Sequence, residues 1–429
     1  MKRARWGIEL GLICLGGLGL RVGYVLNAHD AILSGDGNWY HHSANLLVDG
    51  HGFIDPIKYT YIFRQVLPAA HHPPAWTLVL AVPSLFGFRA IVEHQLMACV
   101  VGAAAIAMVG LTGRRLAGPR TGLVAAGIAA VYPNFWMHER ELAAETLVLL
   151  LVATTMLAAY RFWARPGPLA AMAVGVGCAL LALTRAEAVL LFVVLLAPLV
   201  WLCRGVAWRR RLGWVALAGT AGVVVMAPWV AYNMSRFDHP VFLTTSLGAT
   251  LRVANCPGVY FGPHMGWWEI RCFRSPPFTG DASGRELQLR HLALRYAGAH
   301  SGRIPIVVLA REGRTWGVFR PFQQTVLDSI GGPPASITRL GLFSYWPLSA
   351  AAVAGGVILR RRRVPLLPLL AFVVNVAVAV ALTFGQTRYR APAEVTIVVL
   401  AAVAVDAMLP RRRRGAMGLA DGPRAHSHA

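Results

Sequence analysis

The chain has 429 residues, of which 56% are hydrophobic and only 14% are charged. Soluble domains usually carry about a quarter charged residues, so this composition excludes a water-soluble fold of two or three domains. It also excludes a disordered chain, a collagen-like chain and a small disulfide-rich secreted module. The formal net charge is +22, and all but two of the 41 basic residues are arginine. No aromatic-interleaved basic patch or nucleic-acid motif accompanies this charge, so no nucleic-acid partner is expected.

The apolar residues form blocks of about 17 to 22, the length of a helix that crosses a hydrocarbon layer of about 30 Å. The first block, 8–26, follows Lys2, Arg3 and Arg5 and is expected to be a retained anchor. Nine further spans are expected near 91–111, 120–136, 142–160, 168–184, 187–203, 212–232, 340–359, 365–383 and 393–409. The sequence therefore predicts an all-α polytopic membrane protein with about ten transmembrane helices.

Arginine clusters lie on alternate connections between these expected spans. They are Arg114, Arg115 and Arg120; Arg161 and Arg165; Arg204 and Arg209 to Arg211; Arg360 to Arg363; and Arg411 to Arg414. Because positively charged loops stay in the cytoplasm, both termini are expected there, in a multi-pass protein of the plasma membrane. The block 75–87 is too short to span and contains Pro83. As a full span it would move the later clusters outside, so a re-entrant or juxtamembrane helix is expected.

Two hydrophilic stretches remain for the outer face, and they define the expected domains. The divisions are a membrane module at 1–232 with its first outer loop at 27–74 and juxtamembrane helix at 75–87, an outer lid at 233–339, C-terminal spans at 340–409, and a disordered basic cytoplasmic tail at 410–429. Cys256 and Cys272 share the expected lid, where the compartment is oxidising. A disulfide between them is therefore expected.

Nearly all the unusual polar residues fall at the expected outer face. They are Asp36, Tyr40, His41, Lys58, Arg64 and His72 in the first outer region, Glu139, Glu141 and Glu145 near the fourth span, Arg185 and Glu187 between the fifth and sixth, and Arg388 and Arg390 beside the ninth. A carboxylate facing several guanidiniums at the membrane boundary suits attack by a hydroxyl on a carbon activated by phosphate. In that chemistry Asp36 is the general base, and the arginines hold the leaving phosphate.

Each feature also has a plain structural interpretation. The alternatives are a turn aspartate for Asp36, an interfacial pair for Arg185 and Glu187, a structural partnership with Arg140 for Glu145, snorkelling to headgroups for Arg388 and Arg390, and an interfacial anchor or lid core, as against a sugar platform, for Trp267 and Trp268. The paired histidines at 41–42 and 71–72 lack the HExxH spacing of a zinc site. No metal site is predicted from the residues alone.

Five segments follow one another in an order that resembles the GT-C glycosyltransferases, polytopic enzymes that use polyprenyl-phosphate sugars. They are GDGNWYHHSANLLVDGHGFIDP at 35–56, HHPPAWTLVLAVPSLFG at 71–87, YPNFWMHERELAAETL at 132–147, LTRAEAVLL at 183–191 and RYRAP at 388–392. The order is most similar to the protein-mannosyltransferase and aminoarabinose-transferase (ArnT-like) branch. The segment 233–272 resembles the lid of uncharacterised actinobacterial members. Two residues depart from the branch, Ala186 in place of its usual proline and Ala144 in place of threonine.

The resemblance implies roles for particular residues. It makes Asp36 the catalytic base, and Glu139, Glu141 or Glu145 a second acidic position that orients the acceptor or a divalent cation. It implies lipid-phosphate contacts from Lys58, Arg64, Arg388 and Arg390, and a substrate pocket with Tyr40, His41, His72, Arg185 and Glu187. No cofactor is certain; a divalent cation is the one candidate.

A lipid-linked donor is consistent with the physical chemistry of the membrane. A polyprenyl chain is held in the bilayer by about 0.8 kcal/mol per methylene, so its sugar head is presented only at the interface. The sequence contains no GxGxxG or P-loop on a strand-turn-helix. The predicted function is inverting transfer of a hexose or pentose from a polyprenyl phosphate to a hydroxyl of an envelope glycan, lipid or protein, on the extracytoplasmic side.

The alternative function is a transporter or flippase for a lipid-linked or anionic substrate. A transporter needs ionisable residues deep in several spans. Here most of them lie toward one predicted face, which favours the enzyme.

Overall fold

The computed structural model describes residues 2–27, 33, 35–62, 64–203, 205–273 and 280–410. Arg204 and the expected tail beyond residue 410 lie outside the described residues. The described chain is helical throughout and contains no strand, only an isolated bridge between Ile54 and Pro68. The predicted all-α fold is confirmed.

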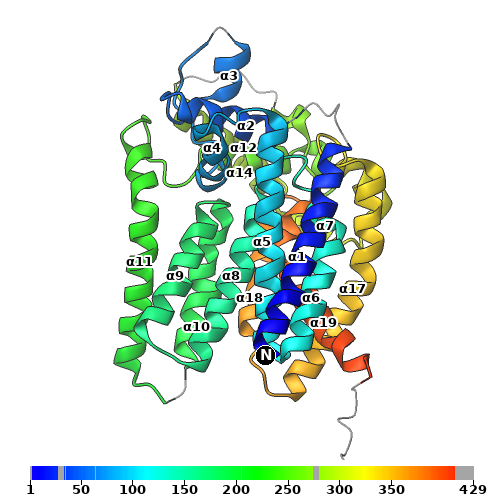
Figure 1. Cartoon of the computed structure of the whole chain (residues 1–429). Helices are drawn as coiled ribbons and strands as arrows, with labels where there is room; N and C mark the ends of the chain where they lie inside the picture. The colour runs from blue at the N-terminus through cyan, green and yellow to red at the C-terminus, as the bar shows by residue number, and fades with distance from the viewer. Residues whose placement is uncertain are drawn as a thin grey trace, which may run out of the picture.

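Ten helical segments, one for each predicted span, form a bundle (Figure 1). Six are long and apolar enough to cross a membrane: α1 (Lys2–Leu26), α5 (Ile91–Ala117), α8 (Glu145–Ala164), α11 (Trp208–Met234), α17 (Ala335–Arg361), and α19 (Ala391–Met408) with the turn before it. Four are shorter apolar segments: α6 (Pro119–Val131), α9 (Pro168–Ala182), Ala186–Trp201, which ends in α10 (Ala197–Trp201), and α18 (Leu367–Leu382). The polytopic architecture follows from these lengths.

The short helices stop early because the sequence interrupts them near one end of the bundle. α6 ends at Val131 since Tyr132, extended at φ −70° and ψ 119°, precedes Pro133. Arg185 is extended as well, at φ −141° and ψ 113°, and separates α9 from the following segment. Gln386 is extended after α18. Polar residues at these breaks therefore lie outside the regular helices, near the same end of the bundle.

The bundle is held together by close approaches between small residues. A Cβ atom at Gly355 of α17 would overlap the carbonyl oxygen of Leu400 in α19. At Gly175 of α9 it would overlap the carbonyl oxygen of Ala218 in α11. Small residues allow such contacts between helix backbones, which are typical of helix packing in membranes.

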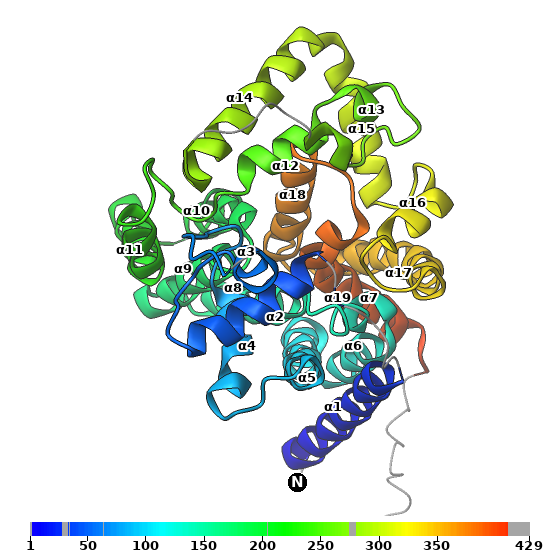
Figure 2. The same ribbon diagram turned by 90° about the horizontal axis from the view of Figure 1, so that it is seen from above.

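The remaining helices gather at the end of the bundle opposite the N-terminus (Figure 1). In the first outer region they are α2 (Gly35–Val48), α3 (Pro56–Tyr61) and α4 (Ala75–Leu85). The lid contributes α12 (Leu247–Ala254), α13 (Pro257–Tyr260), α14 (Ala282–Ala299), α15 (Ile304–Thr315) and α16 (Pro321–Asp328). Seen along the bundle, the lid helices form an arc beside α18 and α17, and α2 and α4 lie next to α5 and α8 (Figure 2). α4 therefore lies at the end of the bundle as a juxtamembrane helix.

The lid contains a disulfide bond between Cys256 and Cys272. Cys256 is fully buried against Val259, Tyr260 and Val307. The bond closes a loop over a sequence separation of 16 residues. Cross-links of this kind restrict the unfolded loop and typically stabilise by about 2–4 kcal/mol.

Reduction should therefore loosen the lid. We expect dithiothreitol to lower the melting temperature of the wild-type protein and to speed proteolysis within residues 233–339. The Cys256→Ser/Cys272→Ser variant should show both effects without reductant and no further change with it. A reductant effect of equal size in that variant would assign the stabilisation to another part of the molecule.

Candidate active site

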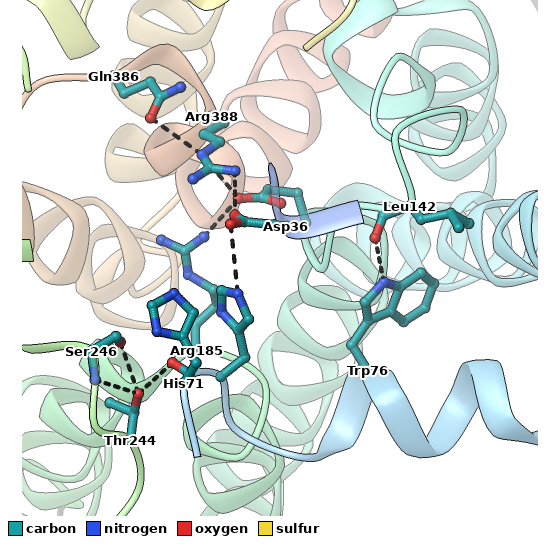
Figure 3. A network of polar contacts seen from close by, with 11 residues as sticks. Asp36, His71, Trp76, Leu142, Arg185, Thr244, Ser246, Gln386 and Arg388 are labelled. Carbon is teal, nitrogen blue, oxygen red and sulfur yellow. Dashed lines mark hydrogen bonds and ion pairs between the residues drawn. The ribbon is translucent and has the colours of Figure 1, made fainter. Parts of the chain in front are cut away.

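A continuous line of ion pairs crosses the end of the bundle that carries the lid. Arg388 Nη1 lies 2.7 Å from Asp36 Oδ2. Arg185 Nη1 lies 2.7 Å from Glu145 Oε1, and its Nε lies 2.8 Å from Glu187 Oε1. The two halves meet where Arg388 Nε is 4.0 Å from Glu145 Oε1. Figure 3 shows Arg388 facing Asp36, with Arg185 beside them. Three carboxylates and two guanidiniums thus share one small region.

The helix breaks explain why these residues meet. Asp36 is in the first turn of α2, directly after Gly35, whose φ of +54° favours glycine. A Cβ atom at Gly37 would overlap the carbonyl oxygen of Glu141, so glycine lets α2 approach the turn before α8. Arg388 lies in the 3-10 turn Thr387–Arg390 that leads into α19, and Arg185 lies in the break after α9.

Asp36 is held in its ionised form. Burial opposes ionisation, but the Arg388 guanidinium, with His72 and His71 nearby, keeps the pKa of the Asp36 carboxyl well below its usual range. His72 Nε2 is 3.5 Å from Asp36 Oδ1. Burial lowers the pKa of His72 to about 3, so this ring is neutral at physiological pH. The charged partner of Asp36 at that pH is therefore Arg388.

A cavity of about 460 Å³ opens beside Asp36. One wall consists of residues 35–37 and of the turn before α8, including Glu141. The opposite wall belongs to the lid and contains Trp268, Arg314, Gln324 and Asp328. A second, much smaller pocket is lined by Glu145, Arg185, Glu187, Tyr389 and others. Arg388 lines both spaces and separates them.

The structure brings together most of the residues that the sequence singled out. Asp36, Glu145, Arg185, Glu187 and Arg388 form the ion-pair line described above. His72 joins it beside Asp36, and the Tyr40 ring lies against His72 with centroids 4.7 Å apart. Glu145 pairs with Arg185 and not with Arg140, so the structural alternative considered for it is not the arrangement found.

Other predicted site residues lie in different surroundings. Arg390 is 1% exposed, pairs with Glu394 at 2.6 Å and donates to the carbonyl of Thr315 at 2.7 Å. Glu139 pairs with Arg21 at 2.7 Å, and both side chains are fully buried. These two pairs brace the bundle below the site.

The remaining three predicted residues lie toward the first outer region. His41 contacts His94, with 3.1 Å between their Nδ1 atoms. Lys58 is on α3 and Arg64 is exposed in the following loop. Neither Lys58 nor Arg64 lines either of the two spaces beside Arg388. Within the described residues, no group of three or more histidine, cysteine or acidic side chains is placed to hold a metal ion.

Sequence reasoning missed both bracing pairs and, apart from Trp268, the residues of the lid wall. Arg21 and Glu394 lie inside predicted spans, where an ionisable residue always requires an explanation, so that signal was available. Arg314, Gln324 and Asp328 carried no comparable signal. They lie in a hydrophilic stretch where polar residues are ordinary, and only folding brings them against α2.

Two glutamates in the turn before α8, the buried Glu139 and the partly exposed Glu141, should contribute differently to stability. Glu139→Ala leaves the Arg21 charge buried and unpaired, which should destabilise the protein by about 3–5 kcal/mol. Glu141→Ala removes a partly exposed carboxylate and should change stability much less. Thermal unfolding in detergent measures both. The double variant Arg21→Met/Glu139→Leu should recover most of the stability that Glu139→Ala loses. If it does not, the two charges themselves are required for stability.

Comparison with known proteins identifies the fold. AglB is the archaeal oligosaccharyltransferase from Archaeoglobus fulgidus, and its structure was solved in complex with an inhibitory peptide and a dolichol-phosphate. This structure superposes on the chain with a TM-score of 0.54 at 17% sequence identity. The superposition covers 95% of this chain and 50% of AglB. The chain has the GT-C fold. A crystal structure of the Archaeoglobus fulgidus oligosaccharyltransferase, tethered to an acceptor peptide that contains the NVT sequon, gives a TM-score of 0.54 at 14% identity over 95% of this chain and 50% of that chain.

A family model gives independent support for the GT-C assignment. Residues 71–232, less than half of the chain, match the family described as dolichyl-phosphate-mannose-protein mannosyltransferase. This segment contains His72, Glu145, Arg185 and Glu187, but neither Asp36 nor Arg388. The predicted resemblance to GT-C proteins is confirmed.

The similarity has clear bounds. ArnT from Cupriavidus metallidurans, bound to undecaprenyl phosphate, is less similar, with a TM-score of 0.44 at 14% identity over 93% of this chain and 77% of ArnT. The chain spans about half the length of the two Archaeoglobus fulgidus structures. No curated protein sequence matches it.

Proposed function

We propose that this protein is a glycosyltransferase that transfers a sugar from a polyprenyl-phosphate donor to an acceptor hydroxyl. The observation that carries the proposal is the Asp36–Arg388 ion pair, which places a carboxylate and a phosphate-binding group at the wall of one cavity. The GT-C fold supports it, since AglB with the same fold was solved with a dolichol-phosphate.

The cavity faces away from the cytoplasm in this proposal. Arg114 and Arg115 end α5, Arg161 ends α8, and Arg360 with Arg361 ends α17. The chain directions place these ends opposite α2 and the lid, on the side of the N-terminus (Figure 1). Since arginine-rich loops are retained in the cytoplasm, the ion-pair line lies at the outer boundary.

A lipid phosphate would bind at the two arginines. Arg388 and Arg185 side chains are 30% and 19% exposed, so they are accessible while being held by carboxylates. A guanidinium offers paired donors that match phosphate oxygens. Val148, Ala391 and Pro392 give the smaller pocket apolar walls beside these charges. A phosphate at this position keeps its polyprenyl chain close to the hydrocarbon layer.

Phosphate binding would also prepare the base. With no donor bound, Arg388 holds the Asp36 carboxylate. A phosphate that takes over Arg388 leaves Asp36 without its cation, so its pKa rises and it gains affinity for a proton. The acceptor oxygen then bonds to the anomeric carbon while the bond from that carbon to the phosphate oxygen breaks. The hydroxyl proton passes to Asp36, polyprenyl phosphate leaves on the arginines, and the single displacement inverts the anomeric centre.

The Asp36→Asn variant separates the base from the phosphate site. We expect sugar transfer to be abolished, because the amide cannot accept the proton. Binding of undecaprenyl phosphate should be retained or tightened, because Arg388 no longer has to leave a carboxylate. Transfer is measured with radiolabelled polyprenyl-phosphate sugars and envelope fractions, and binding with the unglycosylated lipid. Sustained turnover would reject Asp36 as the base, and lost binding would reject the exchange at Arg388.

Two arginines that the sequence treated alike can be told apart by the same binding assay. Arg388→Gln should weaken undecaprenyl-phosphate binding by about tenfold or more, since a charge-assisted contact is lost. Arg64→Gln, which removes the same charge from an exposed loop, should leave binding unchanged. Equal losses in both variants would place the phosphate elsewhere.

A transporter remains the competing function, and the transfer assay discriminates it. A transporter or flippase moves a lipid-linked substrate without making a new glycosidic bond. Label that stays on the lipid while crossing the membrane of a proteoliposome would favour transport over the proposed enzyme.

A further inference from the structure

The cavity wall that faces Asp36 carries polar residues that the proposed reaction does not use. Arg314 Nη1 donates to Gln324 Oε1 at 3.0 Å. Gln324 Nε2 in turn donates to Asp328 Oδ1 at 2.8 Å. Arg314 is fully buried and Gln324 is 2% exposed, so both are fixed by packing. The Asp328 carboxylate is therefore held in a defined position at the cavity.

An aromatic ring borders the same cavity. Trp268 lines it and packs against Trp267, with ring centroids 4.5 Å apart, and against Phe384 and Val253. The residue after Trp268 is tied to α12 by a backbone hydrogen bond from Glu269 to Val253 at 3.0 Å. The disulfide between 256 and 272 closes the loop that carries the ring. An indole and a carboxylate thus share one rigid wall.

This wall is connected to the arginine that would bind the donor phosphate. Thr387 lines the same cavity as Asp328, and the next residue is Arg388. A group attached to a phosphate at Arg388 has the 460 Å³ cavity on one side and only the much smaller pocket on the other. The larger cavity is the space that can receive it.

We propose that Trp268 and Asp328 form the subsite for the sugar ring of the lipid-linked donor and decide which sugar is accepted; this rests on the proposed function. A sugar ring has an apolar C–H face, which an indole covers, and a rim of hydroxyls, which a carboxylate accepts. A site built to hydrogen-bond a hydroxyl discriminates strongly against a substrate that lacks it, because its polar group is then left unpaired. Asp36 lies across the cavity, on the side from which an acceptor would approach.

The test compares lipids with and without a sugar on the full-length protein in nanodiscs. The probes are undecaprenyl phosphate and undecaprenyl phosphates carrying mannose, glucose, galactose or arabinose. The wild-type protein should bind at least one glycosylated lipid about tenfold or more tightly than the bare lipid. Trp268→Ala and Asp328→Asn should lose that difference and keep their affinity for the bare lipid. Trp268→Phe should keep part of it.

Two exposed residues provide matched controls. Trp201→Ala removes an indole that is 56% exposed at the opposite end of the bundle, and Asp238→Asn neutralises an exposed lid carboxylate. Both should preserve the sugar-dependent difference. Loss of the difference in these controls would show that it does not report on the cavity wall and would overturn the assignment.

The outcomes separate this inference from the function on which it rests. A wild-type protein that binds no undecaprenyl phosphate, bare or glycosylated, overturns the proposed function. A protein that binds both lipids, but whose Trp268→Ala and Asp328→Asn variants keep the full difference, overturns only the subsite. If the two variants bind the bare and the glycosylated lipid more weakly by the same factor, the residues have a structural role, and the subsite assignment is overturned as well. If the two variants lose affinity for free methyl glycosides but not for lipid-linked sugars, the wall binds the acceptor, and the donor subsite is overturned.

Discussion

The contact between Asp36 and Arg388 is the interaction on which the arrangement of the lid-bearing end of the bundle depends. Its two residues come from the first outer region and from the turn before the last helix, far apart in the sequence. Each side chain is about one-third exposed, so neither charge is fully hydrated and each requires the other. Glu145 and Arg185 extend the pairing into the bundle. The larger cavity and the smaller pocket then lie on the two sides of Arg388.

Interrupted helices make this arrangement compatible with a membrane. In hydrocarbon every backbone polar group has to be satisfied within the protein, so irregular chain is tolerated only where it is buried or lines a wet space. Here the breaks at Tyr132, Arg185 and Gln386 occur near the same end, under α2 and the lid. The polar residues at these breaks, together with Asp36 and His72, form the candidate site.

The sequence predicted the span order and the juxtamembrane helix because hydrophobic blocks and arginine clusters are local signals. It also selected Asp36, Arg185 and Arg388, since ionisable residues at a membrane boundary are rare. It could not distinguish Arg388 from Arg390, because the 3-10 turn between them sends one to Asp36 and the other to Glu394. It named Trp268 of the lid wall but could not foresee Arg314, Gln324 and Asp328, whose contacts exist only after distant segments have packed.

The close contact between α17 and α19 determines how the start of α19 is supported. Gly355 allows the two helix backbones to touch, and a sliding motion would drive the Leu400 carbonyl into a neighbouring side chain. The start of α19, and with it Arg388, is therefore anchored against α17. The lid meets that pair through hydrogen bonds from Trp346 and Thr338 of α17 to the carbonyls of Gly317 and Thr325. The same helix pair also supplies Thr338 and Leu342 to the lining of the larger cavity, so that cavity has one wall on α17 and another on the lid.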